Sequence, residues 1–224
     1  MKIIEPSATL IRPQTPEGGL IALRAIESMA RISHHSEDAQ TEDSWKRFIE
    51  AVVIQHGDWS VVEHGVASVI FRVDRGITHE LVRHRLFSFT QESTRFVNGA
   101  KKYPDGLEFI MPEGWHATSS DTKIHVWCRS MEKAETDYLT LLQCGIRPQE
   151  ARSVLPNALA STVGVTGNFR AWRWFFLART TKESHPDMRR VTIPLLAQFK
   201  EKIPVLFDDI EPEARQIDHA KKPH

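Results

Sequence analysis

The order of apolar segments along the chain is the feature that most constrains its fold. Apolar side chains recur at helical spacing in five stretches: 16–31, 45–53, 124–143, 169–179 and about 186–203, the last with Pro194 expected to kink or interrupt it. Strand-like runs occur at 66–73, 107–111 and 159–165. Helices and strands do not alternate strictly. The pattern therefore predicts an α+β fold, with a central mixed or antiparallel sheet and long flanking helices, and not a doubly wound sheet.

The length and the tail predict a simple domain organisation. A chain of 224 residues can bury one substantial core, so residues 1–210 are expected to form a single domain. Residues 211–224, with Pro212, Lys221 and Lys222, are expected to form a flexible C-terminal tail.

Charge and cysteine content exclude several classes of protein. The 29 basic and 29 acidic residues balance, which gives no reason to expect nucleic acid or an anionic membrane as a partner. No apolar run approaches membrane-spanning length, and the N-terminus lacks a signal core. Cys128 and Cys144 lie sixteen residues apart on one predicted helix, so reduced thiols and a cytoplasmic protein are expected.

The most distinctive stretch runs from Arg83 to Arg95. It holds three arginines and one glutamate, with hydroxyl and amide side chains between them. Arginine presents a planar fork of donors that suits phosphate or carboxylate oxygens, so the stretch predicts an anion site. The alternative is a solvated helix face that happens to be basic. Thr78 is expected to cap a short helix from His79 to about Phe87, with Glu80 and Arg83 on one face. Ser93 to Arg95 are expected in a loop or short strand.

Several common site chemistries find no support in the sequence. The eleven histidines are scattered, without H-E-x-x-H or C-x-x-C, so no metal site is expected. Neither G-x-G-x-x-G nor a Walker loop is present, and Ser93 lacks the G-x-S-x-G elbow of a hydrolase. A nucleotide cofactor would need arginines and helix N-termini to hold its phosphates.

The order of residues in the basic stretch resembles the signature of the flavin-dependent thymidylate synthases. Arg83-His84-Arg85 is followed after seven residues by Ser93 and then by Arg95. Further blocks of this family are similar to residues 30–33, to Ser60 with Glu63-His64, to residues 150–156, and to residues 168–179. The resemblance covers residues 20 to 200, and several blocks in one order are more specific than one short motif.

This resemblance implies reductive methylation of dUMP to dTMP. Methylenetetrahydrofolate would be the carbon donor, and FAD reduced by NADPH would supply the hydride. The implied catalytic residue is Arg179, on the uracil ring. The implied dUMP-binding residues are Glu80, Arg83, Gln91, Glu92, Ser93, Thr94, Arg95, Arg152 and Arg179. The implied FAD-binding residues are Ser60, Arg83, His84, Arg85, Gln91, Asn168, Arg170 and Trp174. The resemblance also implies a homotetramer with sites shared between subunits.

The chain departs from the family pattern at several positions, and other interpretations remain open. Asp58, Gln91, Trp174 and residues 180–187 differ from the residues common in the family. Arg152 alone is compatible with a helix cap, and Arg179 with a helix-dipole partner. Ser93 reads as a phosphate ligand and not as a nucleophile. The alternatives are a flavin- or nucleotide-binding relative without methyl transfer, or an RNA-binding module.

Overall fold

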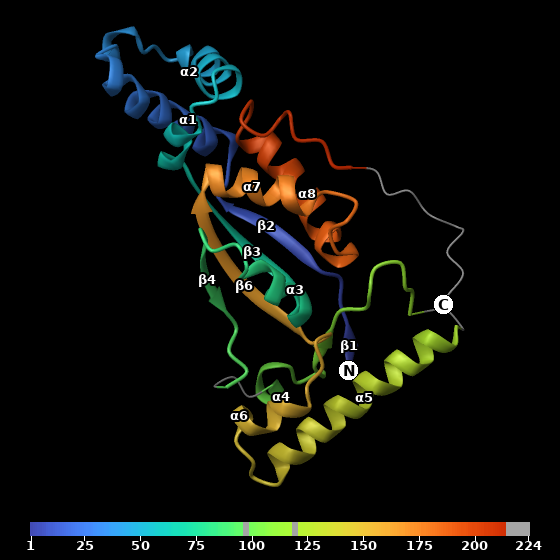
Figure 1. The fold of residues 1–224 in the computed structure, drawn as a ribbon. Helices are drawn as coiled ribbons and strands as arrows, with labels where there is room; N and C mark the ends of the chain where they lie inside the picture. The colour runs from blue at the N-terminus through green and yellow to red at the C-terminus, as the bar shows by residue number, and fades with distance from the viewer. Residues whose placement is uncertain (96–98, 118–120, 214–224) are drawn as a thin grey trace. The chain divides into compact units, whose positions relative to one another are not determined.

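The computed structural model describes residues 1–95, 99–117 and 121–213. Its elements fall into two compact units (Figure 1). The first unit contains Met1–Ile11 and Ser68–Gly167, and the second contains Arg12–Ala67 and the chain from Asn168 onward. Helices and strands are both well represented without strict alternation, which confirms the predicted α+β class.

A four-stranded sheet is the centre of the first unit. Its strand order is β2 (Ser7–Arg12), β3 (Val66–Asp74), β6 (Ala160–Asn168) and β4 (Ser88–Gln91). Strand β4 runs antiparallel to β6, with Ser88 opposite Thr166 and Gln91 opposite Val163. Buried and partly exposed residues alternate along β3 and β6, because successive side chains point to opposite faces of a sheet. The predicted strands at 66–73 and 159–165 are confirmed.

Two strands of this unit carry little signal in the sequence. Strand β1 (Lys2–Ile3) has only two residues and pairs in parallel with β5 (Glu108–Phe109), within the strand expected at 107–111. In β2 only Leu10 is fully buried, so the usual alternation of apolar and polar residues is weak.

Helix α5 (Thr122–Gln143) provides the main helical packing of the first unit. Met131 and Tyr138 on α5 belong to a buried cluster with Leu107, Phe109, Ala151 and Leu159. Gly145 follows with φ of +81°, a conformation that glycine adopts without strain, and it ends the helix as expected. The chain then enters the short helix α6 (Pro148–Ala151) beside the end of α5, followed by a 3₁₀ turn, Arg152–Val154 (Figure 1). The short helix α4 (Gly99–Lys102) also belongs to this unit.

The helix predicted from His79 to Phe87 exists, but both its first and its last residue were predicted wrongly. Helix α3 spans Arg75–Leu81, and Asp74 caps it by accepting a hydrogen bond from the Ile77 N–H at 3.0 Å. Thr78 lies inside the helix, where its hydroxyl donates to the Arg75 carbonyl at 2.8 Å. Asp74 prevails because it is the last residue of β3, directly before the helix, and has a stronger capping preference than threonine.

The structure also explains why α3 ends early. Residues 82–87 form turns that bring Phe87 onto β6, where a side chain at Gly167 would lie 2.2 Å from the Phe87 ring. Only glycine permits this close packing. Arg83 therefore lies in a turn and does not share a helix face with Glu80.

The second unit is built from helices. Helix α1 (Pro16–Arg31), helix α7 (Phe169–Arg179) and helix α8 (Pro186–Lys202) agree with the predicted ranges, and α8 continues through Pro194 without interruption. The helix expected at 45–53 appears as α2 (Ser44–Phe48) followed by a π-helical segment, Ile49–Gln55. The second unit also contains three short 3₁₀ segments, Ile32–His34, Glu37–Ala39 and Trp59–His64.

The core of this unit is aromatic. On α7, Phe175 packs against Trp172 and Phe176, and these two contact Phe199. Phe207 contacts Phe176 and Phe199, and the neighbouring ring centroids of this cluster lie 4.9 to 6.1 Å apart. These side chains are fully buried, as the apolar stripe of α7 predicts. Within the described residues, no helix has both the length and the apolar character needed to cross a bilayer.

Candidate functional site

The Arg83–Arg85 segment is anchored by aromatic side chains and not by its arginines. Arg83 and Arg85 are exposed, whereas His84 is half-buried with its ring centroid 6.0 Å from that of Phe87. Phe87 in turn contacts Phe89 on β4 edge to face, with ring centroids 6.1 Å apart. The fold thus fixes the backbone of this segment and leaves two guanidinium groups at the surface.

Gln91, at the end of β4, connects three elements of the first unit. Its amide nitrogen donates to the Thr78 hydroxyl of α3 at 3.1 Å and to the Ser161 hydroxyl of β6 at 3.2 Å. A neutral amide suits this position because it donates to both hydroxyl groups. Gln91 therefore ties the stretch Arg83–Arg95 to α3 and to the sheet.

Glu92 belongs to a charged cluster, and it is the only member of this cluster that the sequence analysis had predicted as a site residue. Arg72 of β3 donates to Glu92 and to the Thr162 hydroxyl, both at 3.1 Å, and through its other terminal nitrogen to Tyr103 at 3.1 Å and Glu108 at 2.5 Å. The second Glu92 oxygen accepts hydrogen bonds from Lys102 at 2.7 Å and Tyr103 at 2.9 Å. The only hint in the sequence was an arginine inside an apolar strand.

The cluster sets the ionisation of Glu92. Burial alone would raise the pKa of Glu92, but hydrogen bonds from Lys102 and Tyr103 and the charges of Lys102 and Arg72 outweigh it, so this pKa lies below its ordinary value of 4.5. Hydrogen bonding to Glu108 and charge attraction likewise raise the pKa of Arg72 above its ordinary value, against the effect of burial. Glu92 is therefore an ionised anchor at the start of the segment Ser93–Arg95.

This arrangement predicts an acid-dependent stability. Because the pKa of Glu92 is lower in the folded than in the unfolded protein, its contribution is complete above pH 4.5 and is lost as the pH falls through the folded value. Glu92→Gln should lower the free energy of unfolding near pH 7 by about 1–3 kcal/mol and flatten its fall in acid. Urea denaturation between pH 3 and 7 measures this.

A matched control lies on α5, where exposed Asp137 pairs with Lys133. Asp137→Asn should leave both the stability and its pH profile nearly unchanged, because exposed pairs contribute little. Equal profiles for wild type and Glu92→Gln would contradict the role of Glu92 as an anchor.

The structure brings Arg152 to Thr94, and both residues belong to the set predicted to bind the substrate. The Arg152 guanidinium donates to the Thr94 hydroxyl at 3.2 Å, although the two residues lie 58 positions apart. The Ser93 hydroxyl accepts a hydrogen bond from the Arg95 N–H at 3.2 Å, which shapes the turn. Residues 93–95 form a loop, as expected. Beside them lies a cavity of about 430 Å³, lined by Arg75, Thr94, Gln149, Arg152, Ser153, Leu155 and Leu159.

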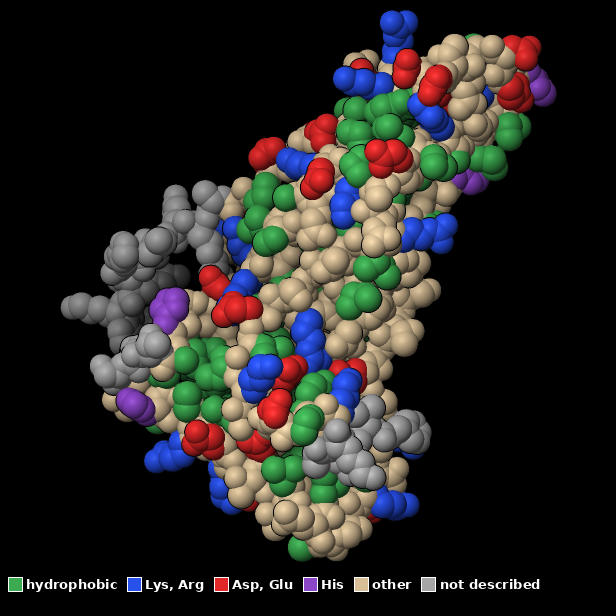
Figure 2. Space-filling view, turned by 180° about the vertical axis from the view of Figure 1, so that it is seen from behind, with side chains coloured by type: hydrophobic (Ala, Val, Ile, Leu, Met, Phe, Trp, Pro, Cys, Tyr) green, Lys and Arg blue, Asp and Glu red, His purple; other side chains and the backbone are tan. Residues whose placement is uncertain are grey.

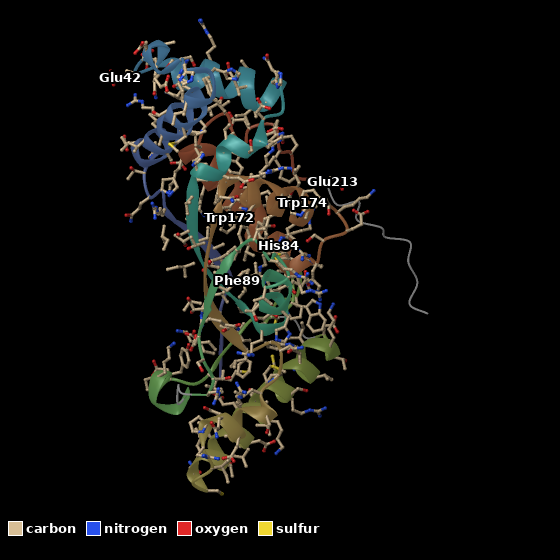
Figure 3. All side chains as sticks on the ribbon, turned by 60° about the vertical axis from the view of Figure 1, so that its left-hand side comes forward. Glu42, His84, Phe89, Trp172, Trp174 and Glu213 are labelled. Carbon is tan, nitrogen blue, oxygen red and sulfur yellow. The ribbon has the colours of Figure 1, made fainter. Side chains whose placement is uncertain are left out.

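The other predicted site residues belong to the second unit. The Asn168 side chain caps α7 by accepting from the Ala171 N–H at 2.8 Å, and Arg170 pairs with Glu63 at 2.6 Å. Ser60 is exposed in the 3₁₀ segment Trp59–His64. Trp174 is 66% exposed whereas Trp172 is fully buried, and the two leave α7 in different directions (Figure 3).

Arg179 is the last residue of α7 and is half-buried. Its carbonyl oxygen accepts a hydrogen bond from the Thr192 hydroxyl at 3.0 Å. The segment that follows is held by Arg189, a buried residue that donates to the carbonyl oxygens of Thr180, Thr181 and Glu213. The departure from the family pattern at 180–187 thus coincides with a firmly bonded segment. Sequence reasoning did not identify Arg189.

The predicted site residues therefore form two groups. The first unit carries Glu80, Arg83, His84, Arg85, Gln91, Glu92, Ser93, Thr94, Arg95 and Arg152. The second unit carries Ser60, Asn168, Arg170, Trp174 and Arg179. Within the described residues, no group of three or more His, Cys, Asp or Glu side chains is arranged to hold a metal ion.

Comparison with known proteins identifies the family. Residues 21–205 match the family described as thymidylate synthase complementing protein. A flavin-dependent thymidylate synthase of Corynebacterium aurimucosum is 34% identical over 171 residues, which cover 70% of this chain and 67% of that protein. The flavin-dependent thymidylate synthase of Mycobacterium sp. (strain JLS) is 35% identical over 173 residues, which cover 71% and 68%.

A solved structure shares the fold. A UMP/dUMP methylase from Streptomyces cacaoi, bound with 5-Br dUMP, matches with a TM-score of 0.72 and 24% identity, covering 93% of this chain and 96% of that one. The matched range includes every block that resembled the family, from residue 30 to Arg179. The chain thus belongs to the thymidylate synthase complementing proteins, the flavin-dependent thymidylate synthase family that its motifs predicted.

Proposed function

We propose that the protein methylates dUMP to dTMP reductively, with methylenetetrahydrofolate as carbon donor and FAD reduced by NADPH. The observation that carries this proposal is the family match together with the meeting of Arg152 and Thr94 beside a cavity. The names of the curated relatives support a flavin-dependent thymidylate synthase, and the bound 5-Br dUMP of the Streptomyces cacaoi enzyme supports a uridine nucleotide substrate.

The substrate would be held mainly by charge-assisted hydrogen bonds. A phosphate monoester is a dianion that suits Arg95, Arg152 and the hydroxyl groups of Ser93 and Thr94. Glu80, Arg83, Gln91 and Glu92 complete the proposed dUMP set. Arg179 would stabilise negative charge on the uracil ring as C5 becomes nucleophilic, because its guanidinium keeps its charge throughout.

The residues present suit FAD. Its diphosphate needs cations, and Arg83 and Arg85 offer exposed guanidinium groups within three residues of each other, with His84 between them. Asn168 uses its side-chain oxygen to cap α7, so its side-chain amide N–H groups remain available to a ligand. The other proposed FAD-binding residues are Ser60, Gln91, Arg170 and Trp174. When bound, FAD supplies the hydride.

The proposal includes an assembly. We place the reaction in a homotetramer of single catalytic domains, with sites shared between subunits as the resemblance implies. We also place the protein in the cytoplasm, because its free Cys128 and Cys144 are compatible with a reducing environment.

The first test is cofactor binding without a dinucleotide fingerprint. Protein purified and incubated with excess FAD should be yellow, and it should oxidise NADPH faster when dUMP is added. Arg83→Ala with Arg85→Ala should weaken FAD binding, measured by flavin fluorescence, because the diphosphate loses two cations. Exposed Arg129→Ala on α5 is the matched control. Protein that stays colourless contradicts the proposal.

The same experiment separates the alternatives. A relative without methyl transfer would bind flavin but form no dTMP, and an RNA-binding module would bind no flavin. On the face shown in Figure 2, Lys and Arg side chains alternate with Asp and Glu and form no single basic patch, which favours a small-molecule site over RNA.

Ser93 provides a second test. Ser93→Ala should retain measurable dTMP formation with a raised KM for dUMP, because the hydroxyl is proposed as a phosphate ligand and shapes the turn at Arg95. Steady-state kinetics measures this. Complete inactivity with dUMP affinity and fold intact would indicate a nucleophile instead.

A further inference from the structure

The C-terminal end of α7 is held by side chains of α8. A helix leaves its last carbonyl oxygens without partners inside the helix. Arg179 is the last residue of α7, and the Thr192 hydroxyl of α8 donates to the Arg179 carbonyl at 3.0 Å. Arg189 lies three residues before Thr192 on the same face of α8, and its Nη1 atom donates to the carbonyls of Thr180 and Thr181. Helix α8 therefore binds three consecutive carbonyl oxygens, beginning with that of Arg179.

Arg189 is a buried charge, although neither the motif pattern nor the proposed function assigns it a role. The residue is only 7% exposed, and its Nη2 atom donates to the Glu213 carbonyl at 2.6 Å. Burying a guanidinium is costly unless its donors are bonded, and its planar fork can bond two segments of chain at once. A cation at the C-terminal end of α7 is also favoured by the helix dipole. The fold thus uses a buried guanidinium to fix the chain that follows Arg179.

Glu213 completes these contacts. Its main-chain N–H donates to the Thr180 carbonyl at 3.2 Å, and its carboxylate accepts a hydrogen bond from the Lys182 N–H at 3.1 Å. Its own carbonyl accepts the bond from Arg189. Glu213 is therefore attached to Arg189 and to the chain after Arg179 through its N–H, its carbonyl and its side chain, although it lies 34 positions from Arg179 in the sequence.

We propose that Arg189 and Glu213 are positioning residues for Arg179, which hold its guanidinium in place while the pyrimidine ring reacts. The proposal rests on the proposed function for the role of Arg179. The main-chain torsions around Arg179 decide where its side chain begins, and planar peptide groups whose carbonyls are bound cannot turn freely. A misplacement of about 1 Å at a reacting group can cost about 100-fold in rate. Residues that fix this backbone therefore control the rate without touching the nucleotide.

The test is a double-mutant cycle on single-turnover dTMP formation by the FAD-loaded protein. Arg189→Met should slow this step about 10- to 100-fold, and it should weaken dUMP binding less, because the phosphate contacts remain. In an Arg179→Ala background the same substitution should cause little further loss, since the group that it positions is already absent. A merely structural role would give the same loss in both backgrounds. Arg189→Lys should recover part of the rate, because a lysine can bond some of the carbonyls but lacks the planar fork.

Glu213→Pro tests the same role without altering the buried guanidinium. It removes the N–H and the carboxylate of an exposed residue, and it should slow the step about 3- to 10-fold, again only when Arg179 is present. It provides the test if Arg189→Met does not fold. Lys200→Met is the matched control, because Lys200 of α8 donates to the Asp208 carbonyl at 3.1 Å and pairs with Glu211 at 2.9 Å. It should change the rate by less than about twofold.

The outcomes separate this proposal from the proposed function. If wild type forms dTMP and the folded variants of Arg189 and Glu213 keep its rate, the positioning role is overturned and the proposed function stands. The same conclusion follows if these variants lose as much rate in the Arg179→Ala background as in wild type. If wild type forms no dTMP from dUMP, the proposed function fails, and the role of both residues fails with it.

Discussion

Replacing Arg179 with alanine is expected to reduce dTMP formation by about 100- to 1000-fold or more while the protein still folds. Negative charge on the uracil ring would lose a cation that is charged at every working pH. Arg179 ends α7, and its backbone is held by Thr192, so the substitution removes the guanidinium without releasing the segment. Single-turnover formation of dTMP measures the effect.

The matched control for this substitution is Lys182→Ala. Lys182 is an exposed cation three residues further along, paired loosely with Glu183 at 3.8 Å, and its loss should leave turnover nearly unchanged. Arg179→Lys should recover part of the activity, because a lysine restores the charge but not the planar fork of donors. Arg179→Ala with more than a tenth of wild-type turnover would exclude Arg179 as the cation on the ring.

Co-refolded subunits carrying either Arg152→Ala or Arg179→Ala are expected to recover about a quarter of the wild-type sites. Each variant alone should be nearly inactive, because each removes a proposed substrate cation. If the two arginines at one substrate come from different subunits across a twofold interface, a hybrid pair has one site with both arginines and one with neither. The measurement is turnover after joint unfolding and reassembly at equal amounts.

Subunit exchange provides the control for this experiment. Mixing the folded variants should restore little activity, because the subunits remain in their original assemblies. Mixtures shown by mass spectrometry to contain hybrids, yet as inactive as either parent, would place Arg152 and Arg179 of one site on the same chain. The shared-site assembly would then be wrong.

Much of the local structure was determined by residues that act within one or two helical turns. Asn168 caps α7 as predicted because its side chain reaches an N–H three residues away. Gly145 ends α5 because its positive φ is a local property. The order of Arg83, Ser93, Arg95, Arg152 and Arg179 identified the family, since that order is itself a feature of sequence.

The helix α3 shows where local reasoning failed. Thr78 and Asp74 were both able to cap, and the choice depended on where β3 ended and on Phe87 packing over Gly167, a contact between residues 80 positions apart. The strands β1 and β2 were missed for a related reason. Short strands with little buried surface are stabilised by their partners and carry no periodicity of their own.

The sequence by itself therefore determined the family, the long helices, the strands β3 and β6, and the arginines of the proposed reaction. Only the tertiary structure decided that Arg72 joins Glu92, Tyr103 and Glu108 in one charged cluster, and that Arg75 shares a cavity with Thr94 and Arg152. These groups come from segments far apart in the chain. Their ionisation and their ligands depend on burial and on distances that the folded sheet creates, and no spacing along the sequence encodes them.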